Sequence, residues 1–174
     1  NTHLSGSINM DGLPNINETF MVIDLRNSIV DPGDLSFLFN EKTLNRLTPM
    51  GRLSLDGQFL GYPNDFVANG NFTGILGAIH SDINFKVNEQ DFDQSVYSGS
   101  LSLKQFDLGT YLNDTLTFQK VSMDGNISGK GLTRNSADFQ LNGHIYQVGV
   151  KGYNYTNIVT DARLAAERFN GLVS

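Results

Sequence analysis

Apolar and polar residues alternate along most of the chain, the pattern of β-strands whose two faces meet different surroundings. The alternation is clearest in residues 52–59, where every second residue is apolar or glycine and those between are polar. It recurs in residues 66–72, 79–87, 97–103, 121–127 and 139–145. The pattern therefore predicts six strands that share one apolar face.

The segments between these strands are short and rich in turn-forming residues, at 61–65, 88–94 and 133–136. Short connections favour sequential hairpins and hence an antiparallel meander. The alternation breaks at 31–39 and 106–112, where we predict short helical turns. Residues 161–172 fit both a helical stripe and a strand, so the pattern leaves that segment open.

A run of polar residue, apolar residue, Asp and Gly occurs three times, ending at Gly12, Gly57 and Gly125. Past Gly57 and Gly125 the alternation continues, which places these glycines inside strands on the apolar face. Glycines at matching positions on successive strands bend a sheet inward. We therefore expect an all-β fold in which a curved antiparallel sheet forms an elongated half-pipe groove with a hydrophobic concave face.

The feature that bears most on function is the apolar stripe, the set of apolar residues on the shared face of the predicted strands. It consists of Leu53, Leu55, Phe59, Phe66, Phe72, Ile79, Ile83, Phe85, Leu101, Leu103, Val121, Met123, Ile127, Phe139, Leu141 and Ile145. One interpretation is a core covered by a second sheet or by helices. The other is an open groove, because the sequence offers almost no amphipathic helix as a cover. At about 4.8 Å per strand, eight to ten strands would make a groove roughly 40–50 Å long, which suits linear apolar chains.

Charge and composition narrow the classes of partner. The 174 residues carry 12 basic and 18 acidic side chains, a net charge of −6, so nucleic acid is not expected as a partner. There is no cysteine, hence no disulfide and no thiolate metal site. We expect no membrane-spanning stretch and no export signal in these residues, and interpret residues 1–174 as a single segment of a longer groove domain.

Motifs for chemistry are nearly absent, and we predict a non-enzymatic protein without metal or cofactor. His3, His80 and His144 are widely separated on positions predicted to be polar. Residues 125–131 resemble a phosphate-binding loop but have the wrong spacing and fall in a strand pattern. Asp91 and Asp93 could hold a cation or form an acid/base pair, although a polar hairpin loop explains them more simply.

The glycine-rich stretches 44–61, 64–77, 97–101, 106–109, 152–158 and 169–171 together resemble the TamB-type translocation and assembly module proteins of the AsmA superfamily. The resemblance covers nearly the whole chain. It implies a periplasmic segment of a Gram-negative cell envelope protein, anchored in the inner membrane through parts not present here. It also implies phospholipid acyl chains as ligands, an outer-membrane barrel protein of the BamA-like class as partner of the full-length chain, and a strand for residues 161–166.

Three functions remain open at this point. The first is a lipid-conducting groove in phospholipid transport between inner and outer membranes and in outer-membrane biogenesis. The second is an assembly chaperone or docking module that captures strands of unfolded barrel proteins at open sheet edges. The third is a glycan-binding sandwich, for which Tyr153 and Tyr155 are the candidate exposed aromatics.

Overall fold

The fold, obtained as a computed structural model, is one curved, unclosed antiparallel sheet. The structure describes residues 2–35, 45, 48–88, 90–131, 136–165 and 168–173. Its strands are β1 (Gly6–Asp11), β2 (Phe20–Val30), β3 (Leu53–Tyr62), β4 (Asp65–Gly74), β5 (Gly77–Lys86), β6 (Val96–Asp107), β7 (Phe118–Lys130), β8 (Asp138–Val150), β9 (Tyr153–Ala165) and β10 (Arg168–Val173). In the described part of the chain, the connections contain the α-helix α2 (Leu108–Leu112) and the short 3₁₀ turns η1 (Ile16–Glu18), η2 (Pro32–Leu35), η3 (Thr48–Met50) and η4 (Phe92–Gln94).

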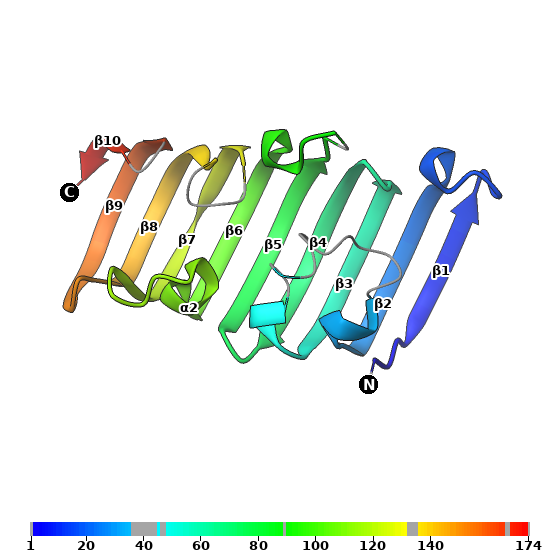
Figure 1. Cartoon of the computed structure of the whole chain (residues 1–174), viewed down its shortest axis with the longest axis horizontal. Coiled ribbons are helices and arrows are strands. Elements are labelled where there is room, and N and C mark those ends of the chain that lie inside the picture. The colour runs from blue at the N-terminus through cyan, green and yellow to red at the C-terminus, as the bar shows by residue number, and fades with distance from the viewer. Residues whose placement is uncertain are drawn as a thin grey trace.

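The ten strands lie side by side in the order of the chain, and each neighbouring pair is antiparallel (Figure 1). The predicted meander is therefore confirmed, and each of the six predicted strands lies in one of β3 to β8. Since successive connections alternate between the two ends of the strands, the sheet has two rims. We call the rim with the β4–β5, β6–β7 and β8–β9 connections the lower rim, as in Figure 1, and the opposite one the upper rim.

The pairing register keeps apolar residues on one face across the sheet. Phe72 pairs with Leu55 on β3 and with Ile79 on β5, and Leu103 pairs with Ile79 and with Met123. Directly opposed residues in a sheet project to the same side. The inner face is therefore apolar, whereas the outer face carries exposed polar side chains such as Asp56, Gln58 and Asp82.

Paired glycines allow the sheet to bend, as the sequence predicted. Gly57 pairs with Gly70, and Gly125 pairs with Gly143. A Cβ added to Gly70 would lie 2.7 Å from the Cα atom of Gly57 and 2.6 Å from the carbonyl oxygen of Asp56. No side chain fits between strands this close, so these positions require glycine.

Besides two register shifts in the β7–β8 pair, strands β2 and β6 each contain a β-bulge near the lower rim, where the register shifts between Leu25 and Ser28 and between Leu103 and Phe106. In each bulge one residue adopts a left-handed conformation, Asn27 with φ 47° and Gln105 with φ 51°. A side chain of the next strand accepts its backbone N–H: Asp56 Oδ1 at 2.6 Å for Asn27 and Ser122 Oγ at 2.9 Å for Gln105. The bulges thus bend the sheet without leaving these donors unpaired.

The bulge and the glycine pair recur with a period of four strands. A bulged strand, β2 or β6, is followed by a short helical turn and then by a strand containing the Asp-Gly run, β3 or β7. The glycine of that run pairs with a glycine on the next strand, β4 or β8. The fold therefore contains two related units, β2–β5 and β6–β9.

The remaining predictions concern the segments between and after these strands. The helical turn expected at 106–112 is α2, and the one expected at 31–39 is confirmed as η2 over Pro32–Leu35, with 36–39 outside the described residues. Residues 161–165 belong to β9 and 168–173 to β10, so the described part of this segment is strand and not helix. Ala166, the last residue of the strand expected at 161–166, lies outside the described residues. The turn expected at 133–136 lies outside the described residues except for Ser136.

Candidate binding groove

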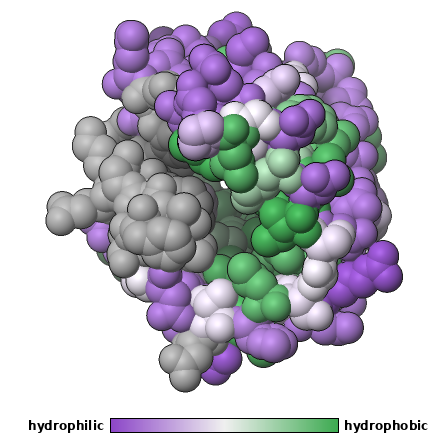
Figure 2. Space-filling view, turned by 90° about the vertical axis from the view of Figure 1, so that its right-hand side faces the viewer, coloured by the Kyte–Doolittle hydropathy of each residue, from purple (hydrophilic) through white to green (hydrophobic). Residues whose placement is uncertain are grey.

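The register brings all sixteen predicted lining residues onto the inner face, across β3 to β8. Thirteen of them are half-buried, which is the exposure expected of side chains that line a trough. Figure 2, a view from the β1 end, shows a hollow with hydrophobic residues on its wall and hydrophilic residues around the outside. The inner surface is therefore apolar and partly accessible.

Three of the predicted lining residues differ from this pattern. Val121, Met123 and Leu141 are only 5–7% exposed and pack with Leu76 and Phe106 in a buried cluster. These three side chains therefore add little to the accessible surface of the inner face. They form the structural core of the second half of the sheet.

Helix α2 explains why the core lies in that half. Leu108 and Tyr111 of α2 pack against the buried cluster, together with Met50 of η3. The ring of Tyr111 meets Phe106 edge to face, with centroids 5.7 Å apart. The helix begins at the N-cap Asp107, whose carboxylate accepts the N–H and the hydroxyl of Thr110, both at 2.9 Å. The sheet therefore carries its own cover over the lower part of β6–β8.

A ladder of aromatic rings lines the upper part of the trough from β3 to β6. Phe59 stacks on Phe66 at 4.4 Å, Phe66 on Phe85 at 5.6 Å, and Phe85 on Tyr97 at 6.1 Å between centroids. Each ring comes from a different strand, so the ladder runs across the strands, along the length of the trough. Such rings give a wide apolar surface with few rotatable bonds.

Beside this ladder the floor of the trough is made of small residues. Gly57, Gly70 and Ser81 follow one another on adjacent strands. Leu55, Phe72 and Ile79 lie on the other side of this line, toward the lower rim. The cross-section over β3–β5 is thus two apolar walls joined by a narrow floor.

The inner positions of β3–β8 carry no Asp, Glu, Lys, Arg or His. The titratable group among them is the phenol of Tyr97, which donates a hydrogen bond of 3.2 Å to the carbonyl of Gly131. Burial raises the pKa of Tyr97 to about 12, with smaller contributions from Asp138 and Tyr111. A surface of this kind offers dispersion and desolvation to a ligand but no acid, base or nucleophile.

The outer face holds the polar and charged groups. His80 is exposed and lies 3.0 Å from the Asn71 side chain, and His144 contacts the ring of Tyr146. Hydrogen bonds from Ser102 and Tyr146 lower the pKa of Asp124, as those from Arg163 lower that of Asp138. These are pairings of a solvated sheet surface.

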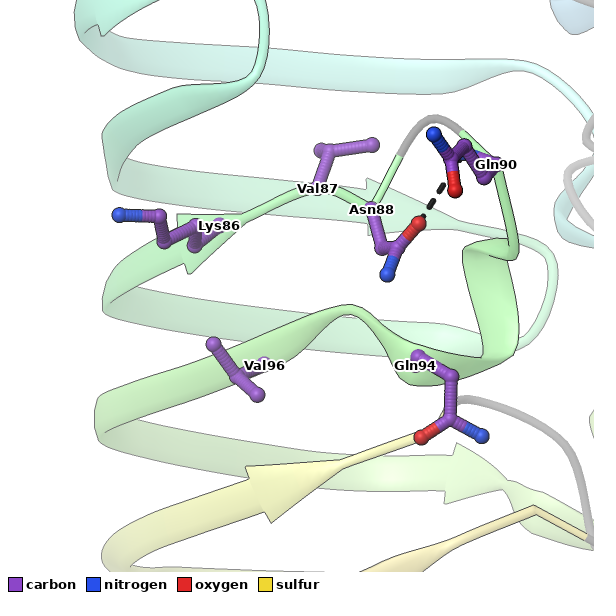
Figure 3. Close-up of a pocket in the computed structure, with 6 residues that line it drawn as sticks. All are labelled: Lys86, Val87, Asn88, Gln90, Gln94 and Val96. Carbon is purple, nitrogen blue, oxygen red and sulfur yellow. Dashed lines mark hydrogen bonds between the residues drawn. The ribbon is translucent and has the colours of Figure 1, made fainter.

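A pocket of 490 Å³ lies at the upper rim between β5 and β6 (Figure 3). It is lined by Lys86, by two valines and by three amide side chains. Asn88 Oδ1 accepts the backbone N–H groups of Gln90 at 3.0 Å and Asp91 at 2.9 Å. Asp91 in turn accepts the N–H of Asp93. The two carboxylates thus belong to a hydrogen-bonded hairpin loop. Among the described residues no group of three or more His, Cys, Asp or Glu is arranged to hold a metal ion.

Two further sequence hypotheses are decided by the fold. Residues 125–130, from the stretch that resembles a phosphate-binding loop, are extended strand within β7. Tyr153 and Tyr155 are exposed, but the described strands form one sheet with no second sheet to make a sandwich. Within the described ranges, no helix is both long and apolar enough to cross a bilayer.

Comparisons with protein-family models, curated proteins and solved structures gave no match. The functional argument for this chain therefore rests on its own geometry.

Sequence reasoning missed the inner-face residues of the first two strands, among them Ile8, Met10, Met21 and Ile23. The alternation in β2 holds from Met21 to Leu25 and then changes phase at the bulge, which obscures it. On the other face, Phe20 meets Tyr62 edge to face at 5.3 Å. An alternation test that permits one phase change would have found β2.

Proposed function

We propose that the inner face binds acyl chains of lipids and that the protein is a non-enzymatic lipid-conducting groove. The observation that supports this most directly is the set of half-buried apolar side chains on a concave face whose inner positions in β3–β8 carry no charged residue. Monomeric proteins rarely leave a contiguous apolar surface of more than a few hundred Å² without a ligand or partner. A linear hydrocarbon chain matches a trough whose long axis crosses the strands.

Binding in such a groove is non-covalent and driven by desolvation. Each CH₂ group transferred from water contributes about 0.8 kcal/mol, so a chain gains affinity with its length. Lipid headgroups stay in water at the mouth, and we expect little selectivity among them. Because the inner face lacks fixed charges, a bound chain meets no strong barrier to sliding.

The wider setting follows from the resemblance to TamB-type proteins of the AsmA superfamily. On this proposal the chain is a periplasmic segment of a Gram-negative envelope protein that moves phospholipid between inner and outer membranes and takes part in outer-membrane biogenesis. Contact with a BamA-like barrel protein and anchoring in the inner membrane would involve parts of the full-length protein outside these residues.

The test is native mass spectrometry of the protein purified without detergent, followed by lipid extraction. We expect co-purifying phospholipid in the wild type and its loss in Ile83→Asp and Leu101→Asp, which place a carboxylate on the inner face. The matched controls are Asn84→Asp and Ser100→Asp, which change exposed outer-face neighbours on the same strands. Lipid-free wild type, or equal loss in inner and outer variants that remain folded by circular dichroism, would refute the acyl groove.

A second function, strand capture from unfolded barrel proteins, is favoured by one observation. Among the described residues, strand β1 pairs with β2 alone, and residues 153–159 of β9 lie beyond the part that pairs with β10. Exposed backbone edges accept an added strand. Ile8→Pro and Met10→Pro in β1 should then abolish binding of an extended barrel-strand peptide while leaving lipid content unchanged. Equal peptide binding by these variants would argue against capture at β1.

A further inference from the structure

Exposed apolar side chains gather on the lower rim. Among the described residues, four large hydrophobic side chains are more than 70% exposed: Ile75, Leu116, Tyr153 and Leu172. Three of them lie at consecutive lower-rim connections: Ile75 in the β4–β5 turn, Leu116 before β7, and Tyr153 directly after the β8–β9 turn. Exposed hydrophobic side chains scattered singly need no explanation, but three on one edge indicate a contact surface.

Hydrogen bonds join these three connections into one fixed edge. The N–H of Asp107 donates to the carbonyl of Leu76 at 2.6 Å, which ties the β4–β5 turn to the start of α2. The N–H of Lys151 donates to the carbonyl of Thr117 at 2.8 Å, which ties the β8–β9 turn to the loop before β7. The exposed side chains are therefore held at fixed positions relative to one another.

Hydrogen bonds within the loop that carries Leu116 also fix its conformation. Asn113 adopts a left-handed conformation with φ 54° and ends α2. Asp114 Oδ1 accepts the N–H of Thr117 at 3.0 Å, and the carbonyl of Asp114 accepts that of Phe118 at 3.0 Å. Leu116, at 89% exposure, is thus presented by a closed turn. A contact made through this loop would cost little ordering entropy.

Charge distinguishes the two rims. Lys104, Lys120 and Lys151 are exposed on or beside the lower rim, and no salt bridge involves them within the described part of the chain. The acids beside these lysines, Asp107 and Asp114, accept hydrogen bonds inside the α2 loop. Asp31 and Asp34, after β2 on the same rim, accept the N–H groups of Gly33 and Thr2.

The upper rim has the opposite character. Its connections carry Glu18, Asp91 and Asp93 and, among the described residues, no Lys or Arg. At its strand ends, Lys86 pairs with Asp65 at 3.4 Å and Arg163 with Asp138 at 2.7 Å. Lys130, also at this rim, donates to Gln94 Oε1 at 3.4 Å. Among the described lysines, those without such a partner in the described residues therefore gather at the lower rim, beside the most exposed apolar side chains.

We propose that the lower rim docks on the surface of a lipid bilayer that contains anionic headgroups. Ile75, Leu116 and Tyr153 would enter the boundary between headgroups and acyl chains, where aliphatic groups are desolvated and tyrosine keeps its hydroxyl in water. Lys104, Lys120 and Lys151 would lie against the anionic headgroups. The inference rests on the proposed function and deepens it, because docking through the lower rim would hold the trough beside the bilayer that supplies or receives its acyl chains.

The experiment measures co-sedimentation of the full 174-residue chain with vesicles of phosphatidylcholine, with or without phosphatidylglycerol. We expect binding to the anionic vesicles. The triple variant Ile75→Ser, Leu116→Ser, Tyr153→Ser should lower the partition coefficient by about 100-fold or more. The matched control replaces three other exposed hydrophobic residues, Leu13→Ser, Ile16→Ser and Leu172→Ser, and should bind like the wild type.

A second set of variants tests the charges. Lys104→Gln, Lys120→Gln and Lys151→Asn should each weaken binding to the anionic vesicles by about fivefold. The upper-rim changes Lys86→Gln and Lys130→Gln are the control and should have no such effect. All variants are compared by circular dichroism to confirm that they are folded.

The absence of native cysteine permits a direct readout of insertion. Leu116→Cys and Leu13→Cys are each labelled with an environment-sensitive fluorophore and mixed with the same vesicles. We expect a blue shift at position 116 and none at position 13. A shift at both positions, or at position 13 alone, would overturn docking through the lower rim.

The outcomes separate docking from the acyl groove. If Ile83→Asp loses co-purifying lipid but still binds vesicles, both proposals stand. If the wild type carries no lipid but binds vesicles through the lower rim, the groove fails and docking stands. If vesicle binding is lost in Ile83→Asp and kept in the lower-rim triple variant, or is absent in the wild type, docking is refuted.

Discussion

Single residues determine the curvature of this sheet. Gly57 with Gly70, and Gly125 with Gly143, bring two pairs of neighbouring strands so close that a methyl group would meet backbone atoms. The polar neighbours of these glycines face solvent and carry no such constraint. The inner and outer positions of one strand should therefore respond very differently to the same substitution.

Gly70→Ala is expected to lower the free energy of unfolding by at least about 2 kcal/mol, because its Cβ cannot be placed without moving β3. The matched control is Asn69→Ala, at the exposed neighbouring position, which should cost no more than about 0.5 kcal/mol. Urea unfolding followed by circular dichroism measures both. Equal costs would mean that the close approach of β3 and β4 is not rigid.

Tyr97 should make stability depend on pH in the alkaline range. Its phenol has an ordinary pKa of 10.0, raised to about 12 in the folded protein mainly by burial. A raised pKa contributes stability that is complete below pH 10 and is lost as the pH rises toward 12, by at most about 3 kcal/mol. Tyr97→Phe should remove that part of the alkaline decline. Identical declines for wild type and variant, measured by urea unfolding at each pH, would contradict the assignment.

At the scale of elements, the connection between β8 and β9 shows how a turn on the lower rim is formed. The β8–β9 connection is a two-residue turn in which Lys151 and Gly152 have φ values of 50° and 81°. This is the geometry of the type I′ hairpin, for which Asn-Gly is the preferred pair. Lysine at the first position is strained, since only Gly, Asn and Asp readily adopt it.

Lys151→Asn is therefore expected to raise the free energy of unfolding by about 0.5–1 kcal/mol. Lys151→Ala removes the same charge without relieving the strain and should give no gain. The comparison separates turn geometry from electrostatics in thermal or urea unfolding. A similar gain in both variants would show that removal of the charge, and not the turn, stabilises the protein.

The cap of α2 offers a second prediction for an element. Asp107→Ala removes two hydrogen bonds to Thr110 and should destabilise the protein by about 1 kcal/mol. Because α2 covers the buried cluster, amide exchange should also accelerate at Val121 and Met123. Unchanged exchange there would mean that the cluster is stable without its helical cover.

The same elements show how far the sequence determines this fold. Strict alternation of apolar and polar residues was enough to predict β3–β8 and to assign every predicted lining residue to the inner face. This works because successive side chains of a strand point to opposite faces, whichever strand it pairs with. Alternation alone could not find β2, where Asn27 shifts the phase. It also could not tell buried Met123 from half-exposed Leu103, since that depends on α2 folding back over the sheet.

For the whole molecule, the important feature is that each described strand pairs with its neighbours in sequence. Among the described strands, each substantial contact is between β-strands adjacent in the chain. Such an array behaves as a one-dimensional chain of interfaces, which opens from its ends.

Hydrogen exchange followed by mass spectrometry should therefore show a gradient across the sheet. Amides of β1 and β10, each bound on one side only, should exchange fastest, and those of β6–β8 beside the buried cluster slowest. Uniform protection from β1 to β10 would indicate one cooperative unit. The lower-rim Ser variants should leave this gradient unchanged.

The four-strand unit of bulge, helical turn, Asp-Gly strand and partner glycine has a consequence for how such a protein changes its size. A further copy of the unit would add four strands, about 19 Å of trough, while reusing types of strand–strand interface that are already present. Tandem duplication of the unit would therefore lengthen the trough in fixed steps without changing its cross-section.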